Sequence, residues 1–316
     1  MTIPCPSYHP TKAILTVGGA VGDVVLTLPE LPRSGADVEA QQQERLIGGC
    51  AFNVARALSQ LNAPVINGMP VGNGPWGAAI DEAMRELGLP VLLRNERRDN
   101  GWCVAMVEPS GERSFISISG CETEWSRAQL NKLPLGADTL VYANGYELAG
   151  EGGQALRAWL LAMPAEQVRV IDPGPRVMQL EPAFLAALSD TETLLTLNRD
   201  EIALLCGGGD PVAAAQRFAK DYRLTLICRL GQDGAWVCPG TEAPWHLPGY
   251  QVSVVDTIGA GDAHCAGLLA GLSSGWPLHY AVDLGNRLAA CVVASAGPDA
   301  ATDWDSLNRR FPVACI

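Results

Sequence analysis

The sequence predicts an α/β fold, a three-layer αβα sandwich with a mainly parallel central sheet and a small β lid. Short apolar runs alternate with amphipathic or Ala-rich stretches along most of the chain, as in folds whose parallel strands are joined by helices. The apolar runs are continuous, which is typical of strands covered on both faces. Together these observations place helices on both sides of the sheet.

The main body begins with an expected strand at 13–18 (AILTVG). Further strands are expected at 138–142, 168–171, 193–197 and 224–228. Helices are expected at 49–61, 77–88, 152–163, 182–189 and 211–220.

Two stretches interrupt this alternation. Residues 21–46 and 101–119 look like strands without helices between them, and the second is a hairpin around the turn Pro109-Ser110-Gly111-Glu112. We expect these two stretches to form a small, discontinuous β lid. The main α/β domain then comprises residues 1–20, 47–100 and 120–316.

Composition excludes several classes of function. The net charge is −12, with 22 Lys and Arg against 34 Asp and Glu, so a nucleic-acid partner is not expected. No apolar run is long enough to span a membrane, and the N-terminus lacks the pattern of a secretion signal. The ten cysteines are scattered singly, which favours reduced, mostly buried thiols. We therefore expect a cytoplasmic protein without a membrane partner.

The strongest motif is the string DTIGAGD, from Asp256 to Asp262, followed by a helical stretch. Its glycines let the backbone approach an anion, and a helix N-terminus presents unpaired amides to phosphate. An aspartate would repel phosphate, but it suits a base that takes the proton from an attacking hydroxyl. The alternative is that Asp262 only caps the helix.

This string resembles the signature of the ribokinase/PfkB family. The resemblance implies a ribokinase-like fold and ATP-dependent phosphorylation of a primary hydroxyl on a sugar or sugar-like substrate. It makes Asp262 the general base and the backbone of residues 259–262 (Gly259, Ala260 and Gly261 with the base itself) the anion hole. It also suggests a monovalent cation, K⁺, near Asp256, Ile258 and Gly297.

Other motifs follow in the order typical of this family. Asn198-Arg199-Asp200-Glu201 resembles its NxxE motif, which implies that Asn198 and Glu201 help to hold Mg²⁺ and phosphate, largely through water. The turn from Arg229 to Gly234 resembles its nucleotide-side turn, which implies ATP contacts from Arg229, Gly231, Gly234 and, farther along, Asn286. The Asn198–Glu201 pair is also compatible with a helix capping box, and both interpretations can hold together.

The expected sugar end lies near the start of the chain. GGCAFNVA, from Gly48 to Ala55, resembles the N-terminal family signature, which implies substrate contacts from Gly48, Gly49 and Asn53. Asp23 follows the first strand, where a carboxylate can accept hydrogen bonds from neighbouring hydroxyls. Glu147 follows a later strand, and ligands bind at strand ends in open α/β sheets. The lid hairpin is expected to close over the sugar and exclude water.

Three features depart from the family pattern or stay open. His264 stands where many members carry Phe, and we expect a satisfied helix residue there. Arg229 occupies a position that is often Thr or Lys, and these side chains differ in geometry. Asp172-Pro173-Gly174-Pro175-Arg176 resembles a DPxxR stretch near phosphates in some relatives, but we favour a turn that fixes the chain.

Other enzyme classes fail on their motifs. GGAVGD lacks the spacing of a dinucleotide-binding loop, no Gly-Lys pair of a P-loop exists, and the signatures of protein kinases are missing. Two alternatives stay open: a nucleoside kinase of the same family, or a catalytically silent sugar-binding regulator. Exposed strands of the lid also offer an edge for a homodimer.

Overall fold

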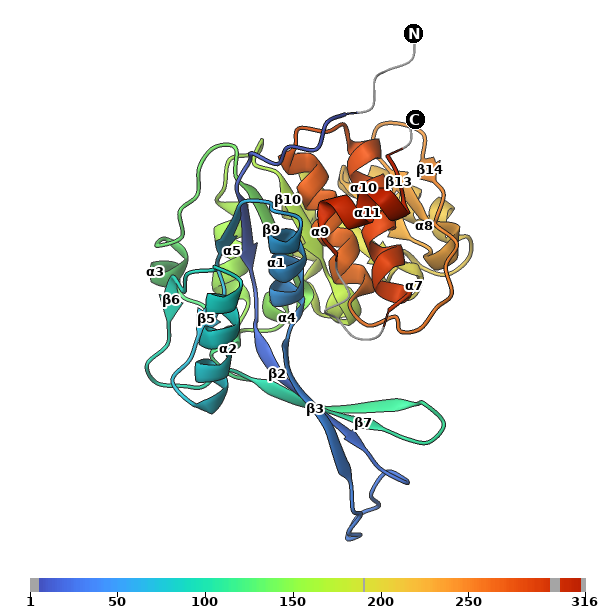
Figure 1. Cartoon of the computed structure of the whole chain (residues 1–316). Coiled ribbons are helices and arrows are strands. Elements are labelled where there is room, and N and C mark those ends of the chain that lie inside the picture. The colour runs from blue at the N-terminus through green and yellow to red at the C-terminus, as the bar shows by residue number, and fades with distance from the viewer. Residues whose placement is uncertain (1–5, 190, 296–301, 314–316) are drawn as a thin grey trace.

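The main body is built on one eight-stranded sheet (Figure 1). The computed structural model describes residues 6–189, 191–295 and 302–313. The strand order is β14-β13-β12-β11-β10-β9-β1-β4. The strands are β1 (Ile14–Val17), β4 (Val65–Asn67), β9 (Leu140–Asn144), β10 (Arg169–Asp172), β11 (Thr193–Asn198), β12 (Thr225–Arg229), β13 (Ala235–Cys238) and β14 (Trp245–Leu247).

Six neighbouring strands, from β4 to β12, are parallel, and β13 and β14 continue the sheet in antiparallel fashion. The five predicted strands are confirmed, with ends within two residues of those expected. Strands β4, β13 and β14 were not predicted. Each has only three or four residues and borders Pro or Gly, which interrupts the pattern that identifies a strand.

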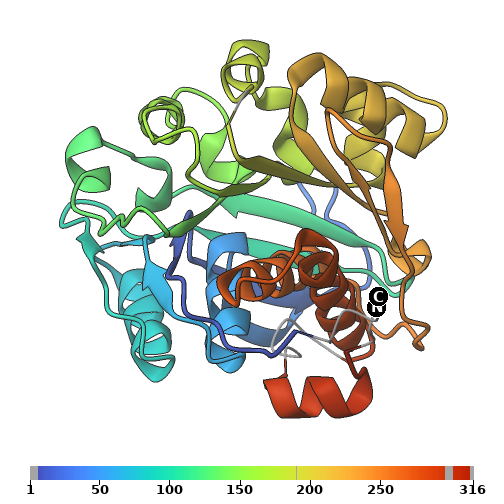
Figure 2. The ribbon, with the colours of Figure 1, turned by 90° about the horizontal axis from the view of Figure 1, so that it is seen from above.

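Helices cover both faces of the sheet, as the sequence predicted (Figure 2). Alternate residues of a strand serve opposite cores: Ile14 packs with one group of helices and Leu15 with the other. The first group is α1 (Cys50–Gln60), α2 (Pro75–Glu86), α9 (Ala260–Ser273), α10 (Leu278–Val293) and α11 (Trp304–Arg310). The second includes α3 (Arg127–Leu130), α5 (Gln154–Leu161), α6 (Pro182–Ala187), α7 (Arg199–Cys206) and α8 (Pro211–Tyr222).

Short elements complete the body. They are α4 (Gly145–Leu148), the paired strands β5 (Pro70–Val71) and β6 (Leu93–Arg94), and the 3₁₀ turns η1 (Cys121–Thr123), η2 (Gly174–Gln179) and η3 (Gly231–Asp233).

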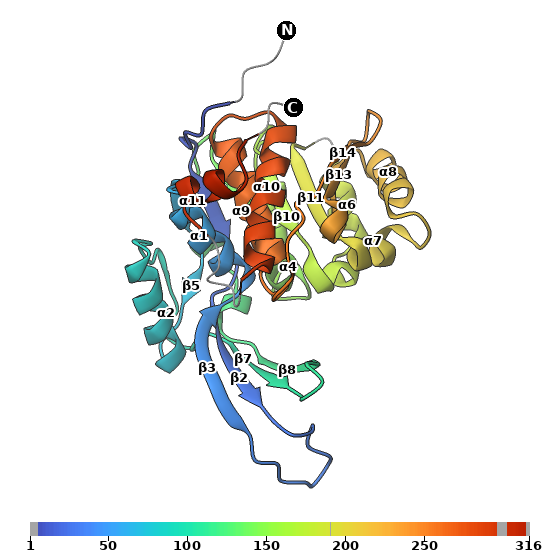
Figure 3. The same cartoon turned by 45° about the vertical axis from the view of Figure 1, so that its right-hand side comes forward.

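A separate four-stranded sheet projects from this body (Figure 3). It consists of β2 (Val21–Thr27), β3 (Gln41–Gly48), β7 (Trp102–Val107) and β8 (Arg113–Ile118), in the order β3-β2-β7-β8. Each of the two stretches that were expected to form strands supplies two of these four strands. The central pair, β2 and β7, is parallel. We call this four-stranded sheet the small sheet; its role as a lid stays a prediction.

Aromatic packing holds the base of the small sheet against α2. The Trp76 ring covers Gly22 of β2, where any side chain would collide with it. The Trp102 ring stacks beside Trp76 with centroids 6.1 Å apart, and the Arg45 guanidinium lies 4.1 Å from the centre of the Trp76 ring. Cation–π and stacking contacts of this kind stabilise a packed junction. The small sheet is therefore attached to the body on the face opposite to Asp23, since Gly22 and Asp23 point to opposite faces of β2.

Candidate active site

The DTIGAGD string forms a loop that leads directly into α9. Gly259 adopts φ 76° at the N-cap, and Ala260, Gly261 and Asp262 form the first turn. A left-handed φ of this kind favours glycine. The Ala260 amide donates to the Thr257 carbonyl oxygen at 3.3 Å. Because the first amides of a helix have no partner four residues earlier, the amides of Gly261 and Asp262 are the donors that this turn presents next to the Asp262 carboxylate. That arrangement of donors around one acid is suited to an incoming phosphoryl group.

The Asp262 carboxylate is held by the start of α1. Asn53 Nδ2 donates to Asp262 Oδ2 at 2.8 Å, and Arg56 Nη2 donates to Asn53 Oδ1 at 2.9 Å. Arg56 thus fixes which end of the Asn53 amide faces the acid. Burial raises the pKa of Asp262 to about 6, and Asp172 adds to the shift, while hydrogen bonds from Asn53 and Cys50 and the charge of Arg229 oppose it. A carboxylate with a raised pKa can act as a base near neutral pH.

The Asp23 carboxylate joins the small sheet to the glycine motif that precedes α1. Cys103 Sγ of β7 donates to Asp23 Oδ1 at 2.7 Å. The other oxygen, Oδ2, lies so close to Gly48 that a Cβ there would collide with it. Gly49 adopts φ 97°, and a Cβ on it would lie 2.6 Å from the carbonyl oxygen of Gly19. Both glycines of the motif therefore allow close backbone approach at this end of the site.

Glu147 lies in α4, directly after β9, and only 6% of the residue is exposed. Its carboxyl group lies against Gly18 and Gly19, which follow β1, and its Oε2 has no hydrogen-bond partner. Burial raises the pKa of Glu147 to about 8, and the nearby Glu122 carboxylate contributes to this shift. Glu147 is consequently protonated at neutral pH and can donate as well as accept a hydrogen bond.

Asn198 and Glu201 form a complete capping box at the start of α7. Asn198 Oδ1 accepts from the Glu201 amide at 2.9 Å, and Glu201 Oε2 accepts from the Asn198 amide at 2.8 Å. Glu201 Oε1 also accepts from Asn198 Nδ2 at 2.7 Å. Both Glu201 oxygens are thus engaged within the protein. They suit a hydrated Mg²⁺ reached through water better than a directly bound ion.

A buried ion-pair network links the ends of β10 and β12 to the start of α7. Arg229 Nη1 and Nη2 donate to the two Asp172 oxygens at 2.9 and 3.2 Å, and Nη2 lies 3.4 Å from Glu201 Oε2. Asp172 also accepts from the Gly174 amide at 3.1 Å, so the expected turn is present. The DPGPR stretch therefore contributes a charge to the site in addition to its turn.

The predicted nucleotide turn borders an open hollow. Gly231 and Gly234 adopt φ 65° and 81° around η3. The hollow has a volume of about 490 Å³ and is lined by Arg199, Asp210, Pro211, Val212, Leu230, Gln232, Asp233, Trp236, His246, Pro248, Gly249 and Gln251. Asn286 of α10 reaches the carbonyl oxygens of Leu247 and Pro248 at 3.4 and 3.3 Å. Asn286 thereby connects α10 to the end of β14 and the loop that follows it.

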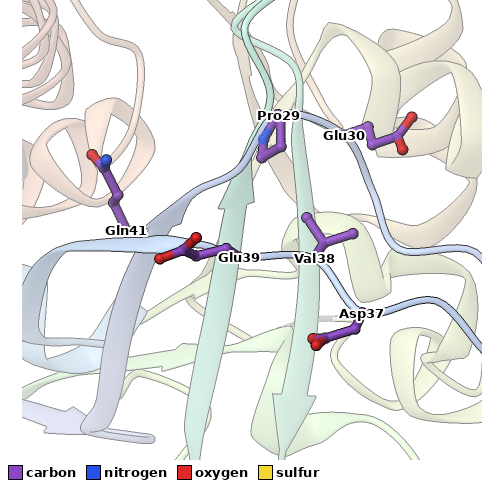
Figure 4. Close-up of a pocket in the computed structure, with 6 residues that line it drawn as sticks. All are labelled: Pro29, Glu30, Asp37, Val38, Glu39 and Gln41. Carbon is purple, nitrogen blue, oxygen red and sulfur yellow. The ribbon is translucent and has the colours of Figure 1, made fainter.

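A second hollow lies far from these groups, in the loop that joins β2 and β3 (Figure 4). Its lining contains none of the predicted site residues. Its residues are Pro29, Glu30, Asp37, Val38, Glu39 and Gln41.

The expected K⁺ site is only partly described. Asp256 Oδ1 accepts from the Ile258 amide at 3.1 Å, and Arg113 of β8 lies 3.6 Å from the same oxygen. Gly297 lies outside the described residues. No cluster of three or more His, Cys, Asp or Glu side chains suited to a metal is present among residues 6–189, 191–295 and 302–313.

His264 is buried in α9, and a side-chain hydrogen bond with Asn286 acts on its ring and favours its charged form. Burial, helped by the charge of Arg229, lowers its pKa to about 3. The ring is therefore neutral at physiological pH, and Gly285 of α10 makes room for it. A proton-transfer role for this ring at neutral pH is not supported.

Sequence reasoning missed Arg56, Cys103 and the partner of Arg229. Arg56 follows Asn53 by three residues on one helix, so the spacing alone could have revealed their contact. Cys103 meets Asp23 only because β2 and β7 pair in register, and nothing local in the sequence indicates this pairing. The same holds for Arg229 and Asp172, which come from strands separated in the sheet by β11.

Comparison with known proteins agrees with this geometry. Residues 11–305 match the model of the pfkB family carbohydrate kinases. The chain is 39% identical over 315 residues to the uncharacterized sugar kinase YegV of Escherichia coli (strain K12), covering 96% of this chain and 95% of that protein. It is 34% identical over 307 residues to adenosine kinase of Saccharomyces cerevisiae, covering 92% and 86%.

Solved structures give the same fold. The ribokinase of Thermotoga maritima superposes with a TM-score of 0.79 at 19% identity, covering 96% of this chain and 99% of that one. The nucleoside kinase of Methanocaldococcus jannaschii superposes with a TM-score of 0.77 at 19% identity, covering 95% and 98%. The predicted ribokinase-like α/β fold is confirmed.

Proposed function

Because the chain belongs to the PfkB family of carbohydrate kinases, we propose that it transfers the γ-phosphoryl group of ATP to a primary hydroxyl of a sugar or sugar-like substrate. Asp262 is the general base of this reaction. The observation that carries the assignment is its position: a carboxylate with a pKa of about 6 in the first turn of α9, among the amides of the expected anion hole.

The substrate occupies the side of Asp262 that faces the small sheet. Asp23 accepts hydrogen bonds from its hydroxyls, and the protonated Glu147 can both accept from them and donate to them. Asn53, Gly48 and Gly49 complete this end of the site. The small sheet closes over the sugar as a lid and excludes water, which suppresses hydrolysis of ATP. Asp262 then takes the proton of the attacking hydroxyl, and the backbone of residues 259–262 stabilises the charge that develops on the phosphoryl group.

The nucleotide lies along the opposite side. Asn198, Glu201 and Arg229 face the phosphates, while Gly231, Gly234 and Asn286 border the rest of ATP, beside the hollow next to η3. Mg²⁺ neutralises phosphate charge when it is bound. Glu201 holds it through water, because both of its carboxylate oxygens already accept protein hydrogen bonds.

The test of this function is a measurement of ADP release with Mg-ATP and K⁺ across free pentoses, ketohexoses, sugar acids and nucleosides. Turnover that depends on one of the sugar classes is the expected result. Turnover with nucleosides alone would establish a nucleoside kinase instead. The similarity to adenosine kinase supports this alternative hypothesis. Binding of a sugar without any turnover would establish the silent regulator.

The pH dependence of the reaction follows from Asp262. Its pKa is raised to about 6, and a base acts only when it is deprotonated, so kcat/KM should be constant above about pH 7. Below pH 6 it should fall about tenfold per pH unit. The measurement is kcat/KM from pH 4.5 to 9 in buffers of constant ionic strength. A plateau that persists to pH 4.5 would contradict the role of Asp262.

We also propose that K⁺ binds near Asp256 and Ile258 and shapes the anion hole. Activity should then be several-fold higher in KCl than in NaCl at equal ionic strength, since Na⁺ has a different radius. Titration with each salt at fixed total chloride measures this difference. Equal activity in both salts would remove the cation from the mechanism.

We also propose a homodimer that forms through the small sheet. The edge strand β8 exposes Phe115 and Ile116, with 58% and 55% of their surfaces accessible, and unpaired edges invite pairing with another chain. Light scattering should give twice the mass of one chain, and Phe115→Lys should restore the monomer. A wild-type protein of monomer mass at every concentration would exclude the dimer.

No helix among the described residues is both long and apolar enough to cross a membrane. A cytoplasmic location stays a prediction of the sequence.

A further inference from the structure

Arg229 occupies a central position between the two ends of the site. It is the last residue of β12, next to Asn198 of β11 in the sheet register. Its side chain is 12% exposed and lies against the anion-hole backbone: a Cβ built on Gly261 would lie 2.5 Å from Arg229 Nη1. The guanidinium is therefore in direct contact with the turn that presents the amides beside Asp262.

The guanidinium is held rigidly by two carboxylates. Asp172 accepts from both Nη1 and Nη2, and Glu201 accepts from Nη2. Two parallel bonds to one carboxylate fix the plane of the guanidinium, which a lysine ammonium cannot reproduce. The cation is thus positioned before any ligand arrives, and this kind of preorganisation makes electrostatic stabilisation effective.

Two donors remain after these contacts. A guanidinium has five N–H groups, and Asp172 and Glu201 account for three of them. The remaining two are the Nε–H, which is buried without a hydrogen-bond partner, and one hydrogen on Nη1, the atom that faces Gly261. A buried donor without a partner costs free energy, so it indicates a position that a ligand acceptor completes.

The charge balance around Arg229 points in the same direction. Two carboxyl groups, Asp172 and Glu201, contact this one guanidinium, and its charge also acts on the nearby Asp262 carboxyl. A phosphoryl group with several negative oxygens cannot approach such a cluster unless a cation faces it. The three lysines of the sequence are Lys12, Lys132 and Lys220, and none of them belongs to a site motif.

We infer that Arg229 is the fixed cation of phosphoryl transfer, donating from Nη1 and Nε to the oxygens of the group in transit between ATP and the substrate hydroxyl. This role rests on the proposed kinase function and changes the assignment of Arg229 from a nucleotide contact to a catalytic residue. Asp172, which accepts from Arg229, from the Gly174 amide of its own turn and from Cys265 Sγ, is then a positioning residue.

The rival explanation is that Arg229 only neutralises Asp172 and Glu201. The variants Arg229→Met, Arg229→Lys and the double variant Asp172→Asn/Arg229→Met separate the two roles, because the double variant removes the charge of both partners together. Arg94→Met is the matched control: Arg94 also makes a two-bond ion pair, with Asp81 at 2.9 Å, but on the body far along the chain from these motifs.

Three quantities are measured for each variant: kcat with the substrate found in the panel, the Kd of Mg-ADP, and the gain in affinity when aluminium fluoride joins ADP as a mimic of the phosphoryl group in transit. For Arg229→Met and the double variant we expect kcat to fall about 10²–10³-fold, as when one donor to a developing charge is removed. The aluminium fluoride gain should disappear, while the Kd of Mg-ADP changes less than about threefold. Arg229→Lys should recover part of kcat, and Arg94→Met should match the wild type.

A kcat of the double variant within about threefold of the wild type would overturn the inference. Uncharged residues at positions 172 and 229 would then be enough for phosphoryl transfer. Equal losses of ADP and aluminium fluoride affinity would also overturn it, because they would make Arg229 a nucleotide contact. If Arg229→Met alone does not fold, Arg229→Lys and the double variant give the answer, and their melting temperatures verify folding. Failure of the kinase proposal is distinct, because the wild type itself would then show no turnover in the panel.

Discussion

Asp262→Asn should reduce kcat about 10³–10⁴-fold while the protein stays folded and still binds Mg-ADP. The amide has the same shape as the carboxylate, and its oxygen can still accept from Asn53, which bonds Asp262 at 2.8 Å. It cannot take up a proton from the substrate, and general base catalysis is worth about 10²–10⁴-fold, with the lost negative charge adding to the effect. Single-turnover kinetics with saturating substrate isolate this chemical step.

The stability of this variant provides an internal check. Because the pKa of Asp262 is raised to about 6, the carboxylate is unfavourable in the folded state above that pH, so Asp262→Asn should melt no lower than the wild type at pH 8. Asp303→Asn is the control, since Asp303 also lies at a helix N-terminus but caps α11. Near-normal turnover by Asp262→Asn would disprove the proposed mechanism.

Glu147→Gln should stabilise the protein strongly at alkaline pH and hardly at all in acid. Burial raises the pKa of Glu147 from 4.5 to about 8. A raised folded-state pKa means that the stability contributed by the carboxyl is complete below about pH 4.5 and is lost as pH rises to about 8. A shift of this size corresponds to about 4–5 kcal/mol at pH 9, all of which the neutral amide avoids.

The measurement is the difference in free energy of unfolding between variant and wild type, from urea titrations at pH 5, 7 and 9. Glu86→Gln, at an exposed carboxyl on α2, is the control for the removal of one surface charge. A difference for Glu147→Gln that is the same at pH 5 and pH 9 would show that Glu147 is not protonated in the native protein at neutral pH.

The part of the candidate site around Asp262 and Glu201 is predictable from local sequence because each motif there is continuous. Asp262 and its glycines occupy one loop, and Asn198 and Glu201 occupy one helical turn, so their spacing determines their geometry. The sheet and its helices are predictable for the same reason, since the apolar runs of β1 and β9 to β12 stand between recognisable helices.

The contacts that tune these residues are not local. Arg229 meets Asp172 across β11, and Cys103 meets Asp23 through the pairing of two strands whose order depends on the whole fold. The protonation of Glu147 depends on burial against Gly18 and Gly19 and on the neighbouring Glu122 carboxylate. Motif spacing carries no information on burial or on the distance between separate loops. The protonation of Glu147 and the ion pair of Arg229 could therefore not be predicted from the sequence.

The parallel pairing of β2 with β7 also imposes an order on folding. Asp23 and Cys103, which face each other in this pair, are 80 residues apart, and α1, β4 and α2 lie in the chain between them. Loop closure over such a distance is entropically costly before the intervening segments are compact. The small sheet should therefore assemble late, after the central sheet has formed, so a nascent chain acquires its eight-stranded sheet and its small sheet as separate events.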